Sequence, residues 1–351
     1  MRLHGRGGRA AMRELHETLL YIAYNLANQN QIITMGAIRQ PLEWMLQEEF
    51  NLEKEMTWLT EKGFLRMNSE KEFSLSEIGK TEAVRINRIR AREDFNQLIN
   101  CATASTAYLD FCEETYGYRM HFFNMMDKEQ LDYLFNSVFV SKSDTILDLG
   151  CGTGCILDNL VKKYACQGIG IDQLDEPTVR RCSPRISYIE GDLDALADYH
   201  MKTTLTLAVD SLYFSNDLDR LIRQLKGMEN NRLYLYYSQY IFDETKKDET
   251  LLHCDHSRLA SILRKNDISY RVVNYSNNEH VLYEKALKAL PKYQEALVSE
   301  GNGDLYEKKI REYRSGKEMY DKGLASRYLY IAECRPVYTT LVSVQPFQRT
   351  P

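Results

Sequence analysis

The stretch TILDLGCGTGCILDNL, residues 145–160, decides how this chain folds. Its first, β-prone residues lead into an acid, Asp148, and predict a short strand. Three glycines follow within five positions, at Gly150, Gly152 and Gly154, and an amphipathic segment begins directly after them. Strand, glycine-rich turn and helix in this order predict a turn whose backbone comes close to a ligand at the helix start.

The residues after this stretch continue the alternation of strand and helix. Such alternation predicts an α/β fold, a mostly parallel sheet with helices on both faces. The expected strands are TILDL, CQGIGID, ISYIEGD, LTLAVDSLYF, NRLYLYYSQYI, ISYRVVNYS and, near the end, SRYLYIAEC. The helices expected between them are CILDNLVKKY, EPTVRRC, LDRLIRQLKGM and HSRLASILRKN.

A segment rich in Glu, Lys and Tyr, residues 276–325, separates the last two expected strands. It is too long for a bare turn, and its pattern predicts two helices with a break at SEGNGD. We expect this insertion to form a helical cap over the substrate side of the sheet.

The N-terminal part differs from the rest, because residues 12–94 read as helices followed by a small hairpin and another helix. This order resembles a winged-helix domain, with FSLSEIGKTEA as its wing strand and next helix start. The predicted organisation is given by residue ranges. It comprises a disordered leader (1–11), a winged-helix-like domain (12–94), linker helices and cofactor lid (95–140), a sheet domain (141–335) and a C-terminal tail (336–351).

Charge argues against a nucleic-acid partner. The net charge is −5, and the segment at the recognition-helix position, QEEFNLEKEMTWLTEK, holds five Glu against two Lys. Acid at that position repels phosphate. The basic run RINRIRAR, residues 85–92, is the counterargument, and we interpret it as the solvated face of a linker helix.

Cysteine usage and hydropathy indicate the cellular compartment in which the protein resides. The eight cysteines are scattered without a Cys-x-x-Cys pair, which argues against disulfides and a zinc module and fits reduced thiols in the cytoplasm. No apolar run approaches the ~20 residues that span a bilayer, and no apolar segment follows the basic start as in a signal peptide. We expect a cytoplasmic protein without membrane contact or bound metal.

The octapeptide LDLGCGTG resembles motif I of the class I S-adenosylmethionine-dependent methyltransferases. The resemblance implies a Rossmann-like sheet whose last strand is antiparallel, and S-adenosylmethionine as cofactor, with S-adenosylhomocysteine as product. It also implies the residues that contact the cofactor: Asp148, Gly150, Cys151, Gly152 and Gly154 from this motif.

Three later strand ends extend the resemblance. Asp172, followed by Gln173 in GIGIDQL, matches the acid that accepts both ribose hydroxyls in the family. Asp192 in IEGDLDAL matches the acid that meets the adenine amino group, with Leu193 beside it. The stretch LAVDSLYF matches motif IV. It places Asp210 and Ser211 near the methyl group, with Tyr213 and Phe214 as aromatic substrate contacts or plain core residues.

The aromatic stretch TYGYRMHFF, residues 115–123, precedes the first strand of the sheet and matches a helix that forms one pocket wall in such enzymes. It offers Tyr118 and His121 as catalytic candidates and Tyr116 and Arg119 as substrate contacts; the alternative is an aromatic core seam between domains. Near the end of the chain, Arg327 is a candidate substrate contact at the pocket edge, and the alternative is that it lies buried in the sheet.

The stretch HCDH, residues 253–256, offers His253 or His256 as the general base. In the small-molecule O-methyltransferases a catalytic histidine follows the fifth strand sooner than here. HCDH also has metal-ligand residue types, but we favour a helix start with Asp255 as N-cap.

The function implied by the resemblance is methyl transfer to an O or N atom of a small-molecule acceptor. The layout is similar to that of small-molecule O-methyltransferases, which implies a homodimer through the N-terminal domain. Two alternatives stay open. One is a peptide or protein methyltransferase in natural-product tailoring, and the other is a transcription regulator that senses S-adenosylmethionine without catalysis.

Overall fold

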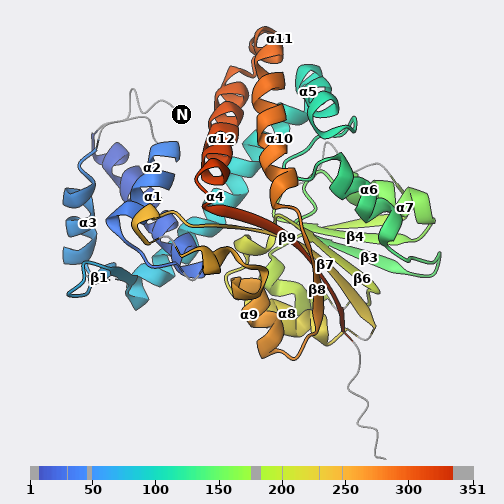
Figure 1. Ribbon diagram of the computed structural model, residues 1–351, viewed down its shortest axis with the longest axis horizontal. Coiled ribbons are helices and arrows are strands. Elements are labelled where there is room, and N and C mark those ends of the chain that lie inside the picture. Colours follow the sequence, from blue (N-terminus) through green and yellow to red (C-terminus); the bar gives the residue numbers. More distant parts are fainter. Residues whose placement is uncertain are drawn as a thin grey trace, which may run out of the picture.

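The structure is a computed structural model that describes residues 8–29, 31–45, 50–174, 183–199, 201–228, 230–246 and 248–334. Its centre is a seven-stranded sheet in the order β5-β4-β3-β6-β7-β9-β8 (Figure 1). The strands are β3 (Thr145–Leu149), β4 (Gln167–Asp172), β5 (Ile186–Glu190), β6 (Leu205–Val209), β7 (Asn231–Tyr240), β8 (Tyr270–Asn274) and β9 (Ala325–Cys334). Only β9 runs antiparallel to its neighbours, which confirms the predicted sheet.

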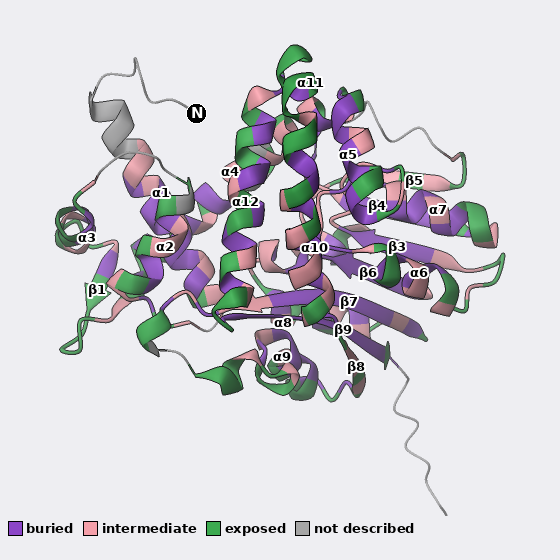
Figure 2. Ribbon diagram, turned by 45° about the horizontal axis from the view of Figure 1, so that its top comes forward, coloured by how far each residue is buried: buried purple, intermediate pink, exposed green. Residues whose placement is uncertain are grey.

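The central strands are buried on both faces, as a parallel sheet covered by helices requires. Every residue of β6 is buried, and so are Ile146, Leu147 and Leu149 of β3. Figure 2 shows the same burial along β7 and β9. Apolar strands of this kind hold the sheet in place, so the loops at their ends are presented at fixed positions.

Helices cover the two faces of the sheet. One face packs against α8 (Leu218–Lys226) and α9 (Arg258–Lys265), which lie below the sheet in Figure 1. The other packs against α5 (Thr106–Tyr116), α6 (Lys128–Ser137), α7 (Cys155–Tyr164) and α10 (Ser276–Ala289). The predicted helix EPTVRRC lies outside the described residues.

The N-terminal part lies beside the sheet, to the left in Figure 1. It contains α1 (Gly8–Asn28), α2 (Met35–Met45), α3 (Leu52–Glu61), the hairpin of β1 (Leu65–Met67) and β2 (Phe73–Leu75), and α4 (Glu77–Thr103). These elements follow the order that the sequence predicts and share one apolar core, whereas the winged-helix assignment stays a prediction.

Two predicted boundaries change. Helix α1 begins at Gly8, so residues 8–11 are helical rather than part of a leader, while 1–7 and the predicted tail 336–351 lie outside the described residues. Helix α4 runs without interruption across the predicted boundary at 94/95. It therefore joins the N-terminal part to the sheet domain as one rigid element.

The insertion forms α10, η6 (Leu290–Tyr293), α11 (Gln294–Ser299) and α12 (Gly303–Asp321), with the break where it was predicted. It packs on α5 through buried hydroxyls, Tyr116 Oη and Tyr313 Oη being 3.0 Å apart. The Glu300 carboxylate accepts hydrogen bonds from Ser105 Oγ and, at 3.1 Å, from Ala107 N at the start of α5. No helix within the described ranges is long and apolar enough to cross a membrane.

Candidate active site

A cavity of about 890 Å³, including its open mouth, lies at the carboxyl ends of β3, β4, β5 and β6. This is where the strand order reverses, the usual ligand site of open α/β sheets. Its floor, as we call it, is formed by the strand-end residues Gly150, Cys151, Gly152, Thr153, Asp172, Gln173, Leu174, Gly191, Leu193, Val209, Asp210 and Ser211. Its roof is formed by Phe95, Ile99, His121, Phe122, Phe123 and Asn124.

The glycine loop has no room for a side chain at two of its positions, Gly150 and Gly154. Gly150 adopts φ +71°, and a Cβ there would lie 2.4 Å from Ser211 Cβ. Gly154 adopts φ +77° at the start of α7, and a Cβ there would lie 2.3 Å from Tyr188 Oη. The loop therefore brings bare backbone and a helix N-terminus to the cavity, as the sequence predicts.

Asp172 ends β4 and holds this loop. Its Oδ2 accepts a hydrogen bond from Gly152 N at 2.7 Å, and its Oδ1 accepts one from Leu174 N at 3.1 Å. Each carboxylate oxygen can accept two hydrogen bonds, so the same group suits a vicinal diol. Gln173 lines the cavity next to it.

Two of the predicted cofactor acids do not line the cavity. Asp148 is 3% exposed, and burial, with a smaller contribution from the charge of Asp172, raises its pKa to about 7. Asp192 Oδ2 lies 3.2 Å from Arg88 Nε, and its Oδ1 accepts a hydrogen bond from Asp194 N at 2.9 Å. Leu193 beside it does line the floor.

Asp210 directly follows β6, adopts φ +52° and has both carboxylate oxygens engaged. Oδ1 accepts from Arg327 Nη1 at 2.6 Å and from Tyr213 Oη at 2.8 Å. Oδ2 accepts from Arg327 Nη2 at 2.9 Å and from Met125 N at 2.9 Å. Tyr213 and Arg327 are therefore partners of Asp210 rather than lining residues, and the Arg327 side chain on β9 is fully buried.

The roof combines two segments that are distant in the sequence. Phe95 and Ile99 lie one turn apart on α4, and the Phe95 ring packs edge-on against Phe214 with centroids 5.3 Å apart. On the same helix Arg88 and Arg92 pair with Asp192 and Glu190, the latter at 2.8 Å. The basic run is thus not only a solvated face, because two of its arginines pair with acids at and just after the end of β5.

His121 is the predicted catalytic residue that the structure places in the cavity. Its Nε2 is buried and has no hydrogen-bond partner among the described residues. Burial, followed by the nearby charge of Arg119, lowers the pKa of His121 below its usual 6.5. The imidazole is therefore neutral at pH ~7 and able to accept a proton.

Three other residues of the aromatic stretch point elsewhere. Tyr116 is fully buried and stacks on Phe122 with centroids 4.6 Å apart, as the alternative of an aromatic core seam predicts. Tyr118 donates to Asp132 at the surface of α6. Arg119 is half exposed and pairs with Asp110 and Glu113 of α5 at 2.5 and 2.7 Å.

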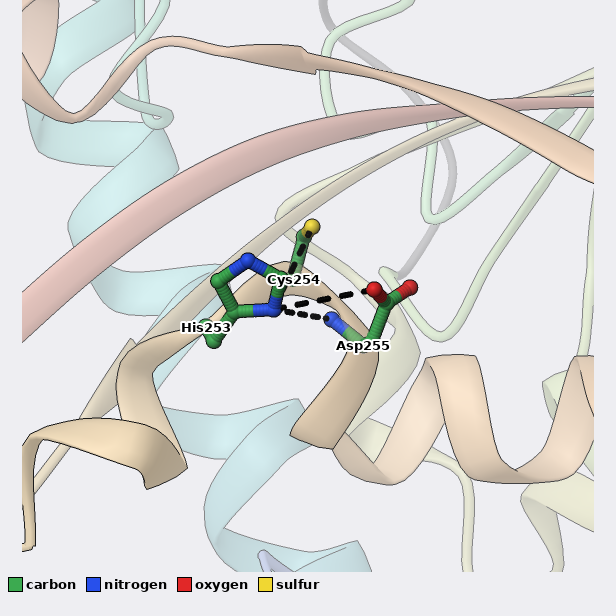
Figure 3. A group of neighbouring side chains, drawn as sticks. All are labelled: His253, Cys254 and Asp255. Atoms are coloured by element: carbon green, nitrogen blue, oxygen red, sulfur yellow. Dashed lines mark hydrogen bonds and ion pairs between the residues drawn. The ribbon is translucent and has the colours of Figure 1, made fainter.

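Neither His253 nor His256 lines the cavity, because HCDH lies in short 3-10 turns between β7 and α9. Figure 3 shows His253, Cys254 and Asp255, whose ligand-type atoms lie within 4.8 Å of one another. The His253 Nδ1 already accepts a hydrogen bond from Asp255 N at 3.3 Å. The stretch does precede a helix, but the N-cap of α9 is Ser257 rather than Asp255.

Several lining residues were not predicted from the sequence. Thr153, Cys155 and Ile156 extend the glycine motif, and the i, i+4 spacing of Phe95 and Ile99 on an apolar helix face was the available signal for the roof. No residue of 276–325 is among the residues that line this cavity in the described chain, and the predicted cap over the substrate side stays a prediction. The insertion supports α5, and α4 with His121–Asn124 covers the cavity.

Comparison with known proteins agrees with this geometry. The family model of methionine biosynthesis protein MetW matches residues 130–215, less than half of the chain. No curated protein sequence matches.

Among solved structures, phosphoethanolamine N-methyltransferase 2 of Haemonchus contortus, in complex with phosphomonomethylethanolamine and S-adenosylhomocysteine, is similar at 11% identity. The match has a TM-score of 0.54 and covers 81% of this chain and 74% of that one. The cyclopropane synthase MmaA2 of Mycobacterium tuberculosis is similar at 10% identity and a TM-score of 0.51, over 67% of this chain and 98% of that one. The chain therefore has the fold of the class I S-adenosylmethionine-dependent methyltransferases.

Proposed function

We propose that this chain is a methyltransferase that binds S-adenosylmethionine on the floor of the cavity and methylates an O or N atom of a small-molecule acceptor. The observation that carries the proposal is the floor itself: bare backbone at Gly150 and Gly152, the start of α7, and Asp172 at the next strand end. The fit is supported by the cradle at Gly150, which a Cβ would fill. The bound cofactor would supply an electrophilic methyl group on a sulfonium.

Different residues of the floor would contact different parts of the cofactor. Asp172 would accept the two ribose hydroxyls, and Leu193 would pack beside the adenine, while the glycine loop and the first N–H groups of α7 would face the carboxylate end. Asp148 and Asp192 would act indirectly, since neither lines the cavity.

The residues of the roof would handle the acceptor. We assign His121 as the general base, because it lines the cavity, whereas Tyr118, His253 and His256 do not. His121 Nε2 would take the proton of the acceptor oxygen or nitrogen as that atom receives the methyl group that the bound cofactor would supply. Phe95, Phe122, Phe123 and Phe214 would exclude water from the reacting atoms.

Enclosure by the roof favours a small acceptor over a peptide, and the phosphomonomethylethanolamine bound by the similar Haemonchus contortus enzyme is itself small. The DNA-binding alternative loses support, because Arg85, Arg88 and Arg92 of the basic run pair with acids of the chain. We further propose a cytoplasmic location, since every cysteine in the described part is a free thiol. A homodimer through the N-terminal domain also stays a proposal.

The proposal is tested with a methyl-labelled cofactor and two acceptor panels, small phenols and amines on one side and unstructured peptides on the other. We expect label in small molecules only, and its loss when excess S-adenosylhomocysteine is added. Label confined to peptides would contradict the small-molecule assignment while leaving the methyltransferase assignment standing.

A further inference from the structure

Two side chains, those of Asp210 and Gln130, bind the backbone N–H and carbonyl of Met125. Its N–H donates to Asp210 Oδ2 at 2.9 Å, and its carbonyl accepts from Gln130 Nε2 at 3.2 Å. Gln130 is fully buried, so its hydrogen bond to the Met125 carbonyl cannot be replaced by one to bulk water without a local opening. Met125 directly follows the roof residues His121–Asn124, so these two hydrogen bonds also fix the position of the end of that roof segment.

Arg327 joins these two contacts. It lies on β9, is 0% exposed, and grips Asp210 with both Nη atoms at 2.6 and 2.9 Å. Its Nε donates to Gln130 Oε1 at 3.0 Å, and Nη1 also donates to Ser238 Oγ at 2.9 Å. A planar guanidinium with bidentate and side-on donors orients both partners at once, which an ammonium cannot do.

We propose that Arg327 is a positioning residue for the roof. Arg327 orients the side chains of Asp210 and Gln130. These two side chains bind the N–H and the carbonyl of Met125. Met125 in turn fixes the position of His121–Asn124 over the floor. Arg327 itself is fully buried and does not line the cavity. The consequence for the acceptor rests on the proposed function, whereas the mechanical link does not.

The link is tested by hydrogen–deuterium exchange on the full chain, comparing wild type with Arg327→Lys and Gln130→Glu. Lysine at position 327 keeps the positive charge but lacks the planar guanidinium with its several N–H donors. Glutamate at position 130 keeps an oxygen that accepts from Arg327 Nε but has no N–H to donate to the Met125 carbonyl. We expect amides of residues 121–126 to exchange roughly tenfold faster or more in both variants, with β3 and β6 unchanged. The matched control is Tyr330→Phe, which removes hydrogen bonds to Cys254 O and Ser257 Oγ on the other face of β9.

Unchanged exchange at residues 121–126 in Gln130→Glu and Arg327→Lys would overturn the proposal. Equal acceleration across β3, β6 and residues 121–126 would also overturn it, because it would show a general loss of stability; if Arg327→Lys does not fold, Gln130→Glu carries the test alone. Titration of each protein with S-adenosylhomocysteine separates the two hypotheses. A wild type that binds none would contradict the proposed function and leave the exchange result valid.

Discussion

The floor and the roof of the cavity differ in how their parts come together. The floor consists of strand ends, so that Gly150, Asp172 and Asp210 meet because their strands lie side by side in one sheet. The roof consists of one turn of α4 and the segment His121–Asn124. The Phe95–Phe214 contact and surface ion pairs place α4, and hydrogen bonds to the Met125 backbone place the segment. The floor is therefore fixed largely by local sequence, whereas the roof depends on contacts between segments that are distant in the sequence.

The largest expected effect concerns chemistry in the roof. Replacing His121 with Gln should lower kcat by about 10²- to 10⁴-fold, the usual contribution of a general base, while the affinity for S-adenosylhomocysteine stays within about threefold. The measurement is turnover of the small molecule labelled in the panel experiment. Unchanged kcat would remove His121 from the mechanism.

The lowered pKa of His121 predicts how catalysis and stability depend on pH. Since burial and Arg119 lower the pKa of His121, the neutral base persists below pH ~6.5, and kcat/KM should fall only as the pH drops through that lowered value. The folded state binds this proton less readily than the unfolded chain, so the contribution of His121 to stability is present above pH ~6.5 and is lost as the pH falls through the lowered pKa. NMR titration of the imidazole, assigned with His121→Gln, gives the midpoint; a value above 6.5 would contradict the burial argument.

The next effect concerns the floor. Gly150→Ala forces a side chain into a left-handed residue and toward Ser211, and should cost about 2–4 kcal/mol in the free energy of unfolding. The matched variant is Gly152→Ala, where no atom lies within 4 Å of the added Cβ and only the backbone cost of about 1–2 kcal/mol remains. Urea unfolding measures both, and equal losses would show that the clash with Ser211 relaxes freely.

A smaller effect is expected for the aromatic contact of the roof. Phe95→Ala removes the edge-on packing against Phe214 and should speed dissociation of S-adenosylhomocysteine about fivefold, equivalent to ~1 kcal/mol. Phe139→Ala is the control, because that phenylalanine is 83% exposed and lies outside the cavity. The same rate for wild type and Phe95→Ala would mean that α4 does not retain the ligand.

The smallest effect concerns the ion pairs between α4 and the end of β5. Arg88→Gln combined with Arg92→Gln should lower the free energy of unfolding by less than about 1 kcal/mol, because both pairs are substantially exposed. The difference should shrink between about 50 mM and 0.5 M salt. A loss of several kcal/mol that salt does not change would show that charge rather than aromatic packing holds α4 in place.

The sequence predicted the floor far better than the roof, and the reason is physical. The motif that ends at Gly154 specifies its own turn, and Asp172 follows because a strand must return to the same edge of the sheet. Phe95 lies more than fifty residues before the motif, and only the docking of α4 brings it to the cavity. Arg327 was placed either at the pocket edge or in the sheet, and only the folded chain reveals its grip on Asp210.

The positions of the insertion and of HCDH could not be predicted from spacing along the chain. Residues 276–325 interrupt the alternation of strand and helix, and in the folded chain their apolar and tyrosine face packs on α5. The histidines of HCDH lie after β7, yet the turns carry them away from the strand ends. Spacing along the chain cannot distinguish these outcomes, because the contact partners are distant in sequence.

The central claim is that the floor binds the methyl donor, and isothermal titration with S-adenosylhomocysteine tests it most directly. Wild type, Asp172→Ala and the control Asp198→Ala, an exposed acid at the same edge of the sheet but outside the cavity, are compared. We predict that wild type and Asp198→Ala bind equally and that Asp172→Ala binds roughly thirtyfold more weakly, a loss of about 2 kcal/mol. No heat with wild type, or equal affinity for all three proteins, would contradict the account.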